Sequence, residues 1–484
     1  MTRVSNVRTD HHWCEVCTLS LALSIASWSA VVAQEARRIP VGQRQLFLDD
    51  DAIQQIANLQ RTLHQPQKRG AVVRSGNPAQ TIQTRAAPVW DPDAKQFKLW
   101  VMGTDEPLRV SSDGLHWTAG PKPNLKFDHA VFDPQDADSA RRFKAALINE
   151  GFAVSSDGVL WTKLDVPAVQ SSDEANMSYD PQQGLFIHSV KRRGTFGRAV
   201  AIATSRDFKS WDDLGVVFQA DELDQELGRK NIQARTTDPT LQQTFHNAPQ
   251  SQNVDVYNMG VFHYEGIYIG MPAMFHATGP VPNYPNTDGF HLVQLACSRD
   301  LKSWVRLGNR STFIGPSRLD SGAYDLTQIL PPSAPVMKDD QLWFYYTGLK
   351  YRANFTYVGT YPTGKTVSIP GRDRDVGAVS LAVLRRDGFI SLDAGEELGT
   401  LLTKPFVLSG SSLRVNADAT SGTIEVTVLD GANQTVAASE PIIGDLPSAS
   451  IQWKTGDLET NKGKTMSLRF SLRNARLYSF WFEP

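Results

Sequence analysis

Short apolar runs rich in β-branched and aromatic residues recur along the middle of the chain, in sets of three. The first run of each set ends in a turn marked by Asp, Gly or Pro, and the second and third follow closely. Such runs, punctuated in this way, predict short strands joined by hairpins. The first runs cover 87–92, 130–134, 177–181, 260–266 and 334–340, the second runs cover 97–102, 142–148, 185–190, 267–271 and 342–346, and third runs cover 108–110, 199–203, 292–296 and 378–383.

A polar signature, Ser-x-Asp-x-x-x-Trp, ends four of the sets. Its aspartates are Asp113, Asp157, Asp207 and Asp300, and the fifth set ends in a shorter variant around Asp387. Asp side chains in turns usually accept hydrogen bonds from nearby backbone N–H groups, so we expect these residues to be structural rather than catalytic. The Trp residues are expected to fill the apolar gaps between neighbouring units.

Each set plus the strand after its signature gives four antiparallel strands, which is one blade of a β-propeller. The five sets therefore predict an all-β fold with a five-bladed propeller over residues 84–400. The long interval between Asp207 and Asp300 implies an insertion in the fourth unit, and long insertions in a repeat tend to lie on the functional face.

The two flanks of the propeller have different patterns. Alternating runs at 413–417, 423–429 and 466–472, with a turn at Asp430-Gly431, predict a small β-sandwich over residues 401–484. Residues 34–83 are expected to pack on the propeller or to supply a strand that helps close it.

The first 33 residues resemble a signal peptide. Arg3 and Arg8 precede an apolar stretch at 19–33 that is too short for a membrane span, and Val31 and Ala33 are spaced like a cleavage site. Cleavage after Ala33 would give an exported protein, periplasmic or secreted, with no membrane attachment; an uncleaved anchor is the alternative. The mature chain would keep only Cys297 and could form no internal disulfide.

Composition narrows the function classes. The chain has 484 residues, 41% of them hydrophobic and 21% charged, which excludes a disordered, collagen-like or membrane-embedded protein. A net charge of −2 gives no reason to expect a nucleic-acid partner. The histidines of the fourth unit show no metal-binding spacing, so we expect no metal and no cofactor. The absence of a long apolar surface run favours a monomer.

A five-bladed propeller followed by a β-sandwich resembles the exported invertase- and fructanase-like glycosidases and, more distantly, the arabinanase-like families. The Ser-x-Asp-x-x-x-Trp turns also resemble the Asp boxes of sialidases, but sialidases have six blades. The resemblance implies an exported glycoside hydrolase that acts on a polysaccharide or oligosaccharide. The catalytic motifs of these families have no counterpart here. The Asp-Pro turns at Asp91, Asp133 and Asp180 are not counted as such a motif, because they recur in three units and are therefore expected to be structural hairpins.

Candidate catalytic residues follow from the expected geometry. The innermost strand of each blade lines the propeller axis, and glycoside hydrolysis needs two carboxylates, one as acid and one as base or nucleophile. Asp128, Glu174 and Asp255 lie before or within three consecutive inner strands, so they are the first candidates. Asp320 is a further candidate that could raise the pKa of a neighbouring carboxylate.

Candidate substrate-binding residues lie in and around the fourth unit. Arg235 could pair with a carboxylate, His276 and Tyr284 could form part of an aromatic platform for a sugar ring, and Asp238 and Asp288 could accept hydrogen bonds from hydroxyls. Two other functions stay open, since a fold does not determine a function. One is a propeller that binds carbohydrate without cleaving it, and the other is a structural or protein-interaction propeller.

Overall fold

The computed structural model describes residues 37–484 except 128, 282–285, 353–357, 361–365 and 369–373. The described residues belong to one compact unit, Arg37–Pro484. The predicted signal peptide, Asp128 and Tyr284 lie outside the described residues.

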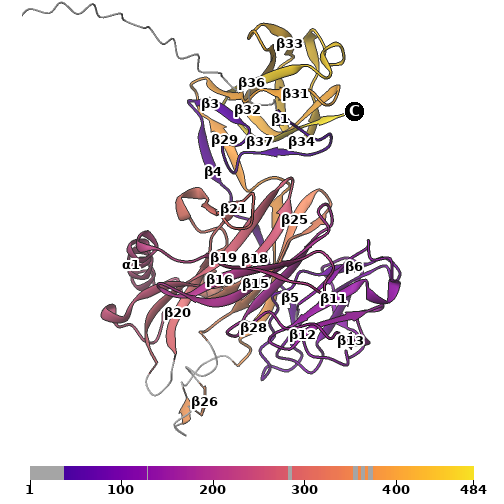
Figure 1. Cartoon of the computed structure of the whole chain (residues 1–484). Helices are drawn as coiled ribbons and strands as arrows, with labels where there is room; N and C mark the ends of the chain where they lie inside the picture. The colour runs from indigo at the N-terminus through magenta and orange to yellow at the C-terminus, as the bar shows by residue number, and fades with distance from the viewer. Residues whose placement is uncertain (1–36, 128, 282–285, 353–357, 361–365, 369–373) are drawn as a thin grey trace, which may run out of the picture. The chain divides into compact units, whose positions relative to one another are not determined.

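Five antiparallel sheets follow one another along the chain, which is the architecture of a five-bladed β-propeller (Figure 1). The first strands of successive blades contact each other, β6 with β10, β10 with β14 and β14 with β18, so these strands surround a common axis. Blade 1 consists of β6 (Val89–Asp91), β7 (Gln96–Trp100), β8 (Leu108–Ser111) and β9 (Thr118–Ala119); blade 2 of β10 (His129–Phe132), β11 (Phe143–Leu147), β12 (Gly151–Ser155) and β13 (Trp161–Lys163); and blade 3 of β14 (Ala175–Asp180), β15 (Leu185–Gly194), β16 (Gly197–Ser205) and β17 (Asp212–Phe218).

The fourth blade carries the insertion. Helix α1 (Glu222–Thr237) precedes it, and an added strand, β20, pairs with β19 beside β21. Asp221 caps the helix by accepting from the backbone N–H of Asp224, whose side chain accepts from the N–H of Asp221 in return. The strands of this blade are β18 (Asn253–Tyr264), β19 (Ile267–Pro280), β20 (Thr287–Val293), β21 (Ala296–Ser298) and β22 (Val305–Arg306).

Blade 5 is completed by a strand from the other end of the chain. Its outermost strand, β5, pairs antiparallel with β28, with Arg74 opposite Ala378 and Gln67 opposite Val383. The pairing closes the ring with backbone hydrogen bonds between segments far apart in the sequence. The blade consists of β23 (Gln328–Leu330), β24 (Val336–Lys338), β25 (Gln341–Leu349), β28 (Gly377–Arg385) and β5 (Gln67–Arg74), and a separate two-stranded sheet consists of β26 (Val358–Thr360) and β27 (Thr366–Ser368).

The signature aspartates have the local role that the sequence predicts. In all four complete copies one carboxylate oxygen accepts from the backbone N–H groups two and three residues later, at 2.7 to 2.9 Å. The N–H of Ser210 and then that of Lys209 lower the pKa of Asp207 to about 2. These turns are therefore stabilised by ionised carboxylates.

The signature tryptophans pack on the preceding blade, as predicted. Trp211 of blade 3, for example, stacks on Phe152 of blade 2, with ring centroids 4.5 Å apart. Blade 5 has Phe389 instead, which is fully buried and packs against Tyr264 of blade 4 at 5.7 Å. The remaining contacts are Trp117 with Tyr345 of blade 5, Trp161 with Trp100 of blade 1, and Trp304 with Phe218 of blade 3.

The C-terminal strands form a β-sandwich that also includes strands from the N-terminal segment (Figure 1). The predicted division of the chain differs here. Strands β1 to β4 of the segment 34–83 join this sheet, while β5 joins blade 5 of the propeller and Gln83 forms a bridge with Met102 of blade 1. The sheet also begins before residue 401, because β29 pairs with both β4 and β37. Its strands are β1 (Arg37–Arg38), β2 (Gln45–Leu46), β3 (Ile53–Ala57), β4 (Gln60–Leu63), β29 (Ile390–Ala394), β30 (Gly399–Thr403), β31 (Phe406–Val407), β32 (Ser412–Asp430), β33 (Thr435–Ser439), β34 (Ile442–Ser450), β35 (Trp453–Thr455), β36 (Thr465–Arg473) and β37 (Ala475–Glu483).

Asp387, the aspartate of the incomplete fifth signature, connects the propeller with the sandwich strands. Its buried carboxylate accepts from Arg44 Nη1 at 2.7 Å, Tyr264 Oη at 2.6 Å, Ser479 Oγ at 2.5 Å and Asn416 Nδ2 at 3.2 Å. Three of these donors belong to the sandwich or to the N-terminal segment that joins it, and Tyr264 belongs to blade 4. The position that closes a local turn in blades 1 to 4 thus joins distant segments in blade 5.

Candidate functional site

Arg85 and Glu174 form an ion pair between two blades that are not neighbours. Arg85 precedes the first strand of blade 1 and Glu174 precedes that of blade 3, each six residues before the turn aspartate of its blade, Asp91 or Asp180. The guanidinium donates from Nε to Oε2 at 2.6 Å and from Nη2 to Oε1 at 2.8 Å. Both side chains are buried. Equivalent positions on separate blades thus meet at the propeller axis.

The pair fixes the charge of Glu174. Burial alone would raise the pKa of this carboxyl, but the charge of Arg85 and its hydrogen bonds outweigh burial and hold the pKa below its usual range. Glu174 is therefore a carboxylate at neutral pH. In glycoside hydrolysis such a group suits the base, the nucleophile or a stabiliser of developing positive charge, and not the proton donor.

A second buried carboxylate, Asp255, lies on β18. Its Oδ2 accepts from Arg198 Nε at 2.8 Å and from the Arg198 backbone N–H at 3.2 Å. Its Oδ1 is buried and accepts no hydrogen bond from any described residue. Gly197 permits this approach, because a Cβ there would lie 2.8 Å from Oδ2 and the residue has φ of +117°. The second oxygen is thus a buried acceptor without a partner among the described residues.

Aromatic and cationic groups join the two carboxylates. The Tyr257 ring lies 3.9 Å from Lys191 Nζ and 4.8 Å from the His291 ring. Arg198 lies over Phe275 at 4.5 Å. We call this cluster the hub; it comprises Arg85, Glu174, Lys191, Arg198, Asp255, Tyr257, Phe275, His291 and Arg352, the last of which lies 4.8 Å over Phe275.

His291 is fully buried in the hub, and neither ring nitrogen has a hydrogen-bond partner among the described residues. Burial, followed by the positive charges of Arg352 and Arg198, lowers its pKa far below the ordinary value. The imidazole is therefore neutral. Burial also raises the pKa of Tyr257 to about 12, with the charge of Glu174 adding to the effect. The neutral Tyr257 hydroxyl is hydrogen-bonded to Glu174, whereas the neutral His291 ring keeps one N–H donor for a ligand.

Asn176 connects the inner strands around the hub. Its Nδ2 donates to the Arg85 carbonyl at 3.0 Å and to the Pro331 carbonyl at 3.3 Å, and its Oδ1 accepts from Asn258 at 3.0 Å. One side chain of blade 3 thus contacts blades 1, 4 and 5. This network holds the starts of the inner strands in a fixed arrangement, which a binding site requires.

Several residues predicted to bind substrate have local partners instead. Arg235 donates to the Gln242 and Leu326 carbonyls, and its guanidinium lies 4.4 Å over the Phe290 ring. The His276 ring also stacks on Phe290, with ring centroids 4.9 Å apart. Burial lowers the pKa of His276 to about 4. These two side chains pack helix α1 against blade 4.

The remaining predicted acids also bind backbone groups or lie exposed. Asp288 is buried and accepts from the N–H groups of Phe245 and His246. Asp238 ends helix α1 and accepts from Thr240. Asp320 is exposed in a short 3-10 turn, Leu319–Ser321. Of the described candidates, only Glu174 and Asp255 belong to the hub, and their catalytic role stays a prediction.

Most hub residues were not candidates in the sequence. Lys191 begins a run of three basic residues at the end of β15, and Arg198 and His291 are single polar residues inside β16 and β20. The available signal was positional: polar residues on β15, β16 and β20 within otherwise apolar runs. Among the described residues, no group of three His, Cys, Asp or Glu side chains is placed to hold a metal ion. No helix in the described part of the chain is long and apolar enough to cross a membrane.

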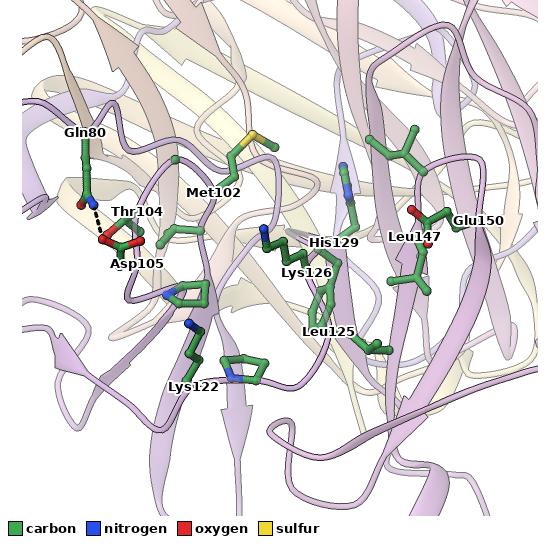
Figure 2. Close-up of a pocket in the computed structure, with 17 residues that line it drawn as sticks. Gln80, Met102, Thr104, Asp105, Lys122, Leu125, Lys126, His129, Leu147 and Glu150 are labelled. Atoms are coloured by element: carbon green, nitrogen blue, oxygen red, sulfur yellow. Dashed lines mark hydrogen bonds between the residues drawn. The ribbon is translucent and has the colours of Figure 1, made fainter.

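A cavity of about 650 Å³ lies beside the hub between blades 1 and 2 (Figure 2). Pockets that bind small molecules are typically about 300–1,000 Å³. Its lining comes from Gln80 and from residues within 101–107, 122–129 and 146–150, the segments that connect β7 to β8, β9 to β10 and β11 to β12. The cavity is continuous with an inner strand, because His129 of β10 forms part of its wall.

No protein-family model and no curated protein matches the chain. Solved structures show distant likeness. They include an N-acetylgalactosamine deacetylase from F. plautii in complex with blood group B trisaccharide (15% identity, 68% of this chain and 95% of that one, TM-score 0.39). They also include the family GH32 β-fructofuranosidase of Bombyx mori (10%, 85% and 93%, TM-score 0.34). A third is a family GH43 arabinoxylan arabinofuranohydrolase from Bacillus subtilis in complex with cellotetraose (10%, 86% and 99%, TM-score 0.31). The architecture itself rests on the strand topology given above.

Proposed function

We propose that this protein is an exported glycoside hydrolase-like propeller that binds a polysaccharide or oligosaccharide at the hub. The observation that carries the proposal is the placement of two buried carboxylates, Glu174 and Asp255, at the starts of the inner strands β14 and β18, in one cluster with Tyr257, Phe275 and His291. Carboxylates, neutral donors and aromatic rings are the groups that bind sugar hydroxyls and the C–H faces of sugar rings.

In a hydrolytic reaction Glu174 would act in its ionised form, as base, nucleophile or stabiliser of the oxocarbenium-like transition state. The free Oδ1 of Asp255 would accept a hydrogen bond from a sugar hydroxyl or from the attacking water. Asp128, on the short segment before β10, stays the sequence candidate for the second catalytic carboxyl.

A non-catalytic carbohydrate-binding propeller is the second candidate. One observation favours it: both described hub carboxylates are held in ion pairs, Glu174 with Arg85 and Asp255 with Arg198, so neither is placed as a proton donor. The same hub would then recognise a glycan without cleaving it.

Purified protein assayed on a broad glycan panel separates the two functions. Hydrolysis that falls at least about 100-fold in Asp128→Asn or Glu174→Gln, with glycan affinity retained, supports catalysis. Binding without release of reducing ends supports the second function. Asp457→Asn, a substitution at an exposed turn carboxylate of the sandwich, is the matched control. Absence of both binding and hydrolysis across the panel would overturn the proposal, and so would full activity and full affinity in Asp128→Asn, Glu174→Gln and Asp255→Asn.

A further inference from the structure

The charged side chains that line the cavity between blades 1 and 2 differ in whether they have a partner among the described residues: the acids do, and the lysines do not. Lys122 and Lys126 are exposed on the segment between β9 and β10, and within the described chain neither forms an ion pair or a side-chain hydrogen bond. The two acids of the wall are both engaged. Asp105 accepts from Gln80 Nε2 at 2.8 Å, and Glu150 accepts from Lys163 Nζ at 3.3 Å. Of these two acids only Glu150 is ion-paired, because the partner of Asp105 is a neutral amide, so the unpaired charges of the described lining residues sum to one positive charge.

The floor of the cavity is apolar and preformed. Val101 and Leu147 are buried there, and Leu125 and Phe127 are half-buried. The Phe127 ring is fixed by Trp161 at 4.6 Å and by Trp100 at 5.9 Å between ring centroids. A fixed apolar surface of this kind suits the C–H face of a sugar ring, which it can contact without losing side-chain freedom.

The cavity and the hub share two walls. The Nε2 of His129, which lines the cavity, is hydrogen-bonded to the carbonyl of Ala175, the residue after Glu174. Met102 pairs with Gln83 through backbone hydrogen bonds, and Arg85 Nη1 lies 3.4 Å from Gln83 Oε1. Two walls of the cavity are therefore hydrogen-bonded to residues next to Glu174 and Arg85 of the hub.

Figure 2 shows Lys126 between the wall that carries Met102 and Asp105 and the wall that carries His129 and Glu150. Lys122 lies on the same segment and also lines the cavity. An anionic group on a sugar ring that rests on the apolar floor would meet one or both ammonium groups. Each primary ammonium has three donors and no acceptor, so it favours an acceptor-only anion.

We propose that the cavity is a subsite for an anionic sugar residue of a glycan chain, with its carboxylate or sulfate bound by Lys122 and Lys126 and its ring packed on Phe127 and Leu125. The proposal rests on the proposed function, because it assigns a substrate class to the same glycan site.

The test compares glycans that differ only in charge. Calorimetric titration of the full purified chain uses an oligogalacturonate, its methyl ester, a sulfated galactan oligosaccharide and its desulfated form. The variant is Lys122→Met combined with Lys126→Met. The control is Lys209→Met combined with Lys302→Met, which removes two exposed lysines from the signature turns of blades 3 and 4. Melting temperatures confirm that both variants are folded.

We expect at least one anionic chain to bind about three- to tenfold more tightly than its neutral counterpart, as exposed charge pairs allow. Added salt and the Lys122/Lys126 variant should both remove this preference, while the control keeps it. If the oligogalacturonate and its methyl ester differ more in affinity, the recognised group is a carboxylate. If the sulfated and desulfated galactans differ more, it is a sulfate. Equal affinity for charged and neutral chains, or an unchanged preference in the Lys122/Lys126 variant, would overturn the subsite while leaving the proposed function intact. Failure to bind any glycan would overturn the proposed function as well.

Discussion

Arg85 and Glu174 hold equivalent positions on blades 1 and 3 and are joined by two hydrogen bonds of 2.6 and 2.8 Å, although blade 2 separates their strands in the ring. The pair is both a part of the proposed site and a connection across the propeller axis. A buried ion pair is costly to break from one side, because the remaining charge loses its partner.

Replacing Arg85 alone tests this connection. Arg85→Met leaves the Glu174 carboxylate buried without its partner, and we expect a loss of about 3–5 kcal/mol in the free energy of unfolding. Arg85→Met combined with Glu174→Gln should lose clearly less than the sum of the single changes. Urea denaturation of the four proteins gives the coupling energy, and additive effects would contradict a direct pair.

The signature aspartates predict a dependence of stability on pH. The folded pKa of Asp207 is about 2, below that of an unfolded Asp near about 4. The stabilisation is therefore fully present above about pH 4 and is lost as the pH falls toward 2. Melting temperatures of Asp207→Asn and the wild-type protein should differ at pH 7 and converge near pH 2. A constant difference across this range would contradict the assignment.

Phe389 replaces the signature tryptophan in blade 5 and fills the gap toward blade 4. The side chain is fully buried, so Phe389→Ala should lower the free energy of unfolding by about 3–5 kcal/mol through lost burial and a cavity. Leu160 is 68% exposed in the signature turn of blade 2, and Leu160→Ala should change stability by less than about 0.5 kcal/mol. Chemical denaturation compares the two, and equal effects would contradict the packing role.

Asp387 accepts hydrogen bonds from four side chains at the junction of the propeller with the sandwich strands. Asp387→Ala would leave the buried Arg44 guanidinium without its carboxylate, and we expect a loss of about 3–5 kcal/mol. Asp387→Asn keeps the shape and part of the hydrogen bonding and should cost less. We expect the propeller and the sandwich to unfold together in the wild-type protein and in two separate calorimetric transitions in Asp387→Ala. A single unshifted transition in the variant would contradict the connection.

The sequence predicted the parts of the fold that local patterns control. Blade number and strand order follow from short apolar runs, and the roles of Asp207 and Trp211 follow from a repeated turn. Partners across the ring could not be predicted, because nothing near Arg85 in the sequence indicates that it meets Glu174. The partners of Arg235, His276 and Asp288 in the fourth unit could not be predicted either, because the carbonyls, N–H groups and Phe290 ring that they contact come from other segments of the chain. Asp387 departs from its repeat because its fifth signature lacks the Ser that orients the other aspartates.

The closure of blade 5 by β5 has a consequence for synthesis. A ribosome delivers residues 67–74 early, but their partner strand, Gly377–Arg385, emerges only after four blades have been made. Until then the nascent chain carries an unpaired β-edge that can recruit a wrong strand, from itself or from a neighbouring copy. The four polar or charged side chains among the eight residues of β5 and its central Gly70 make that waiting edge a poor template for such pairing.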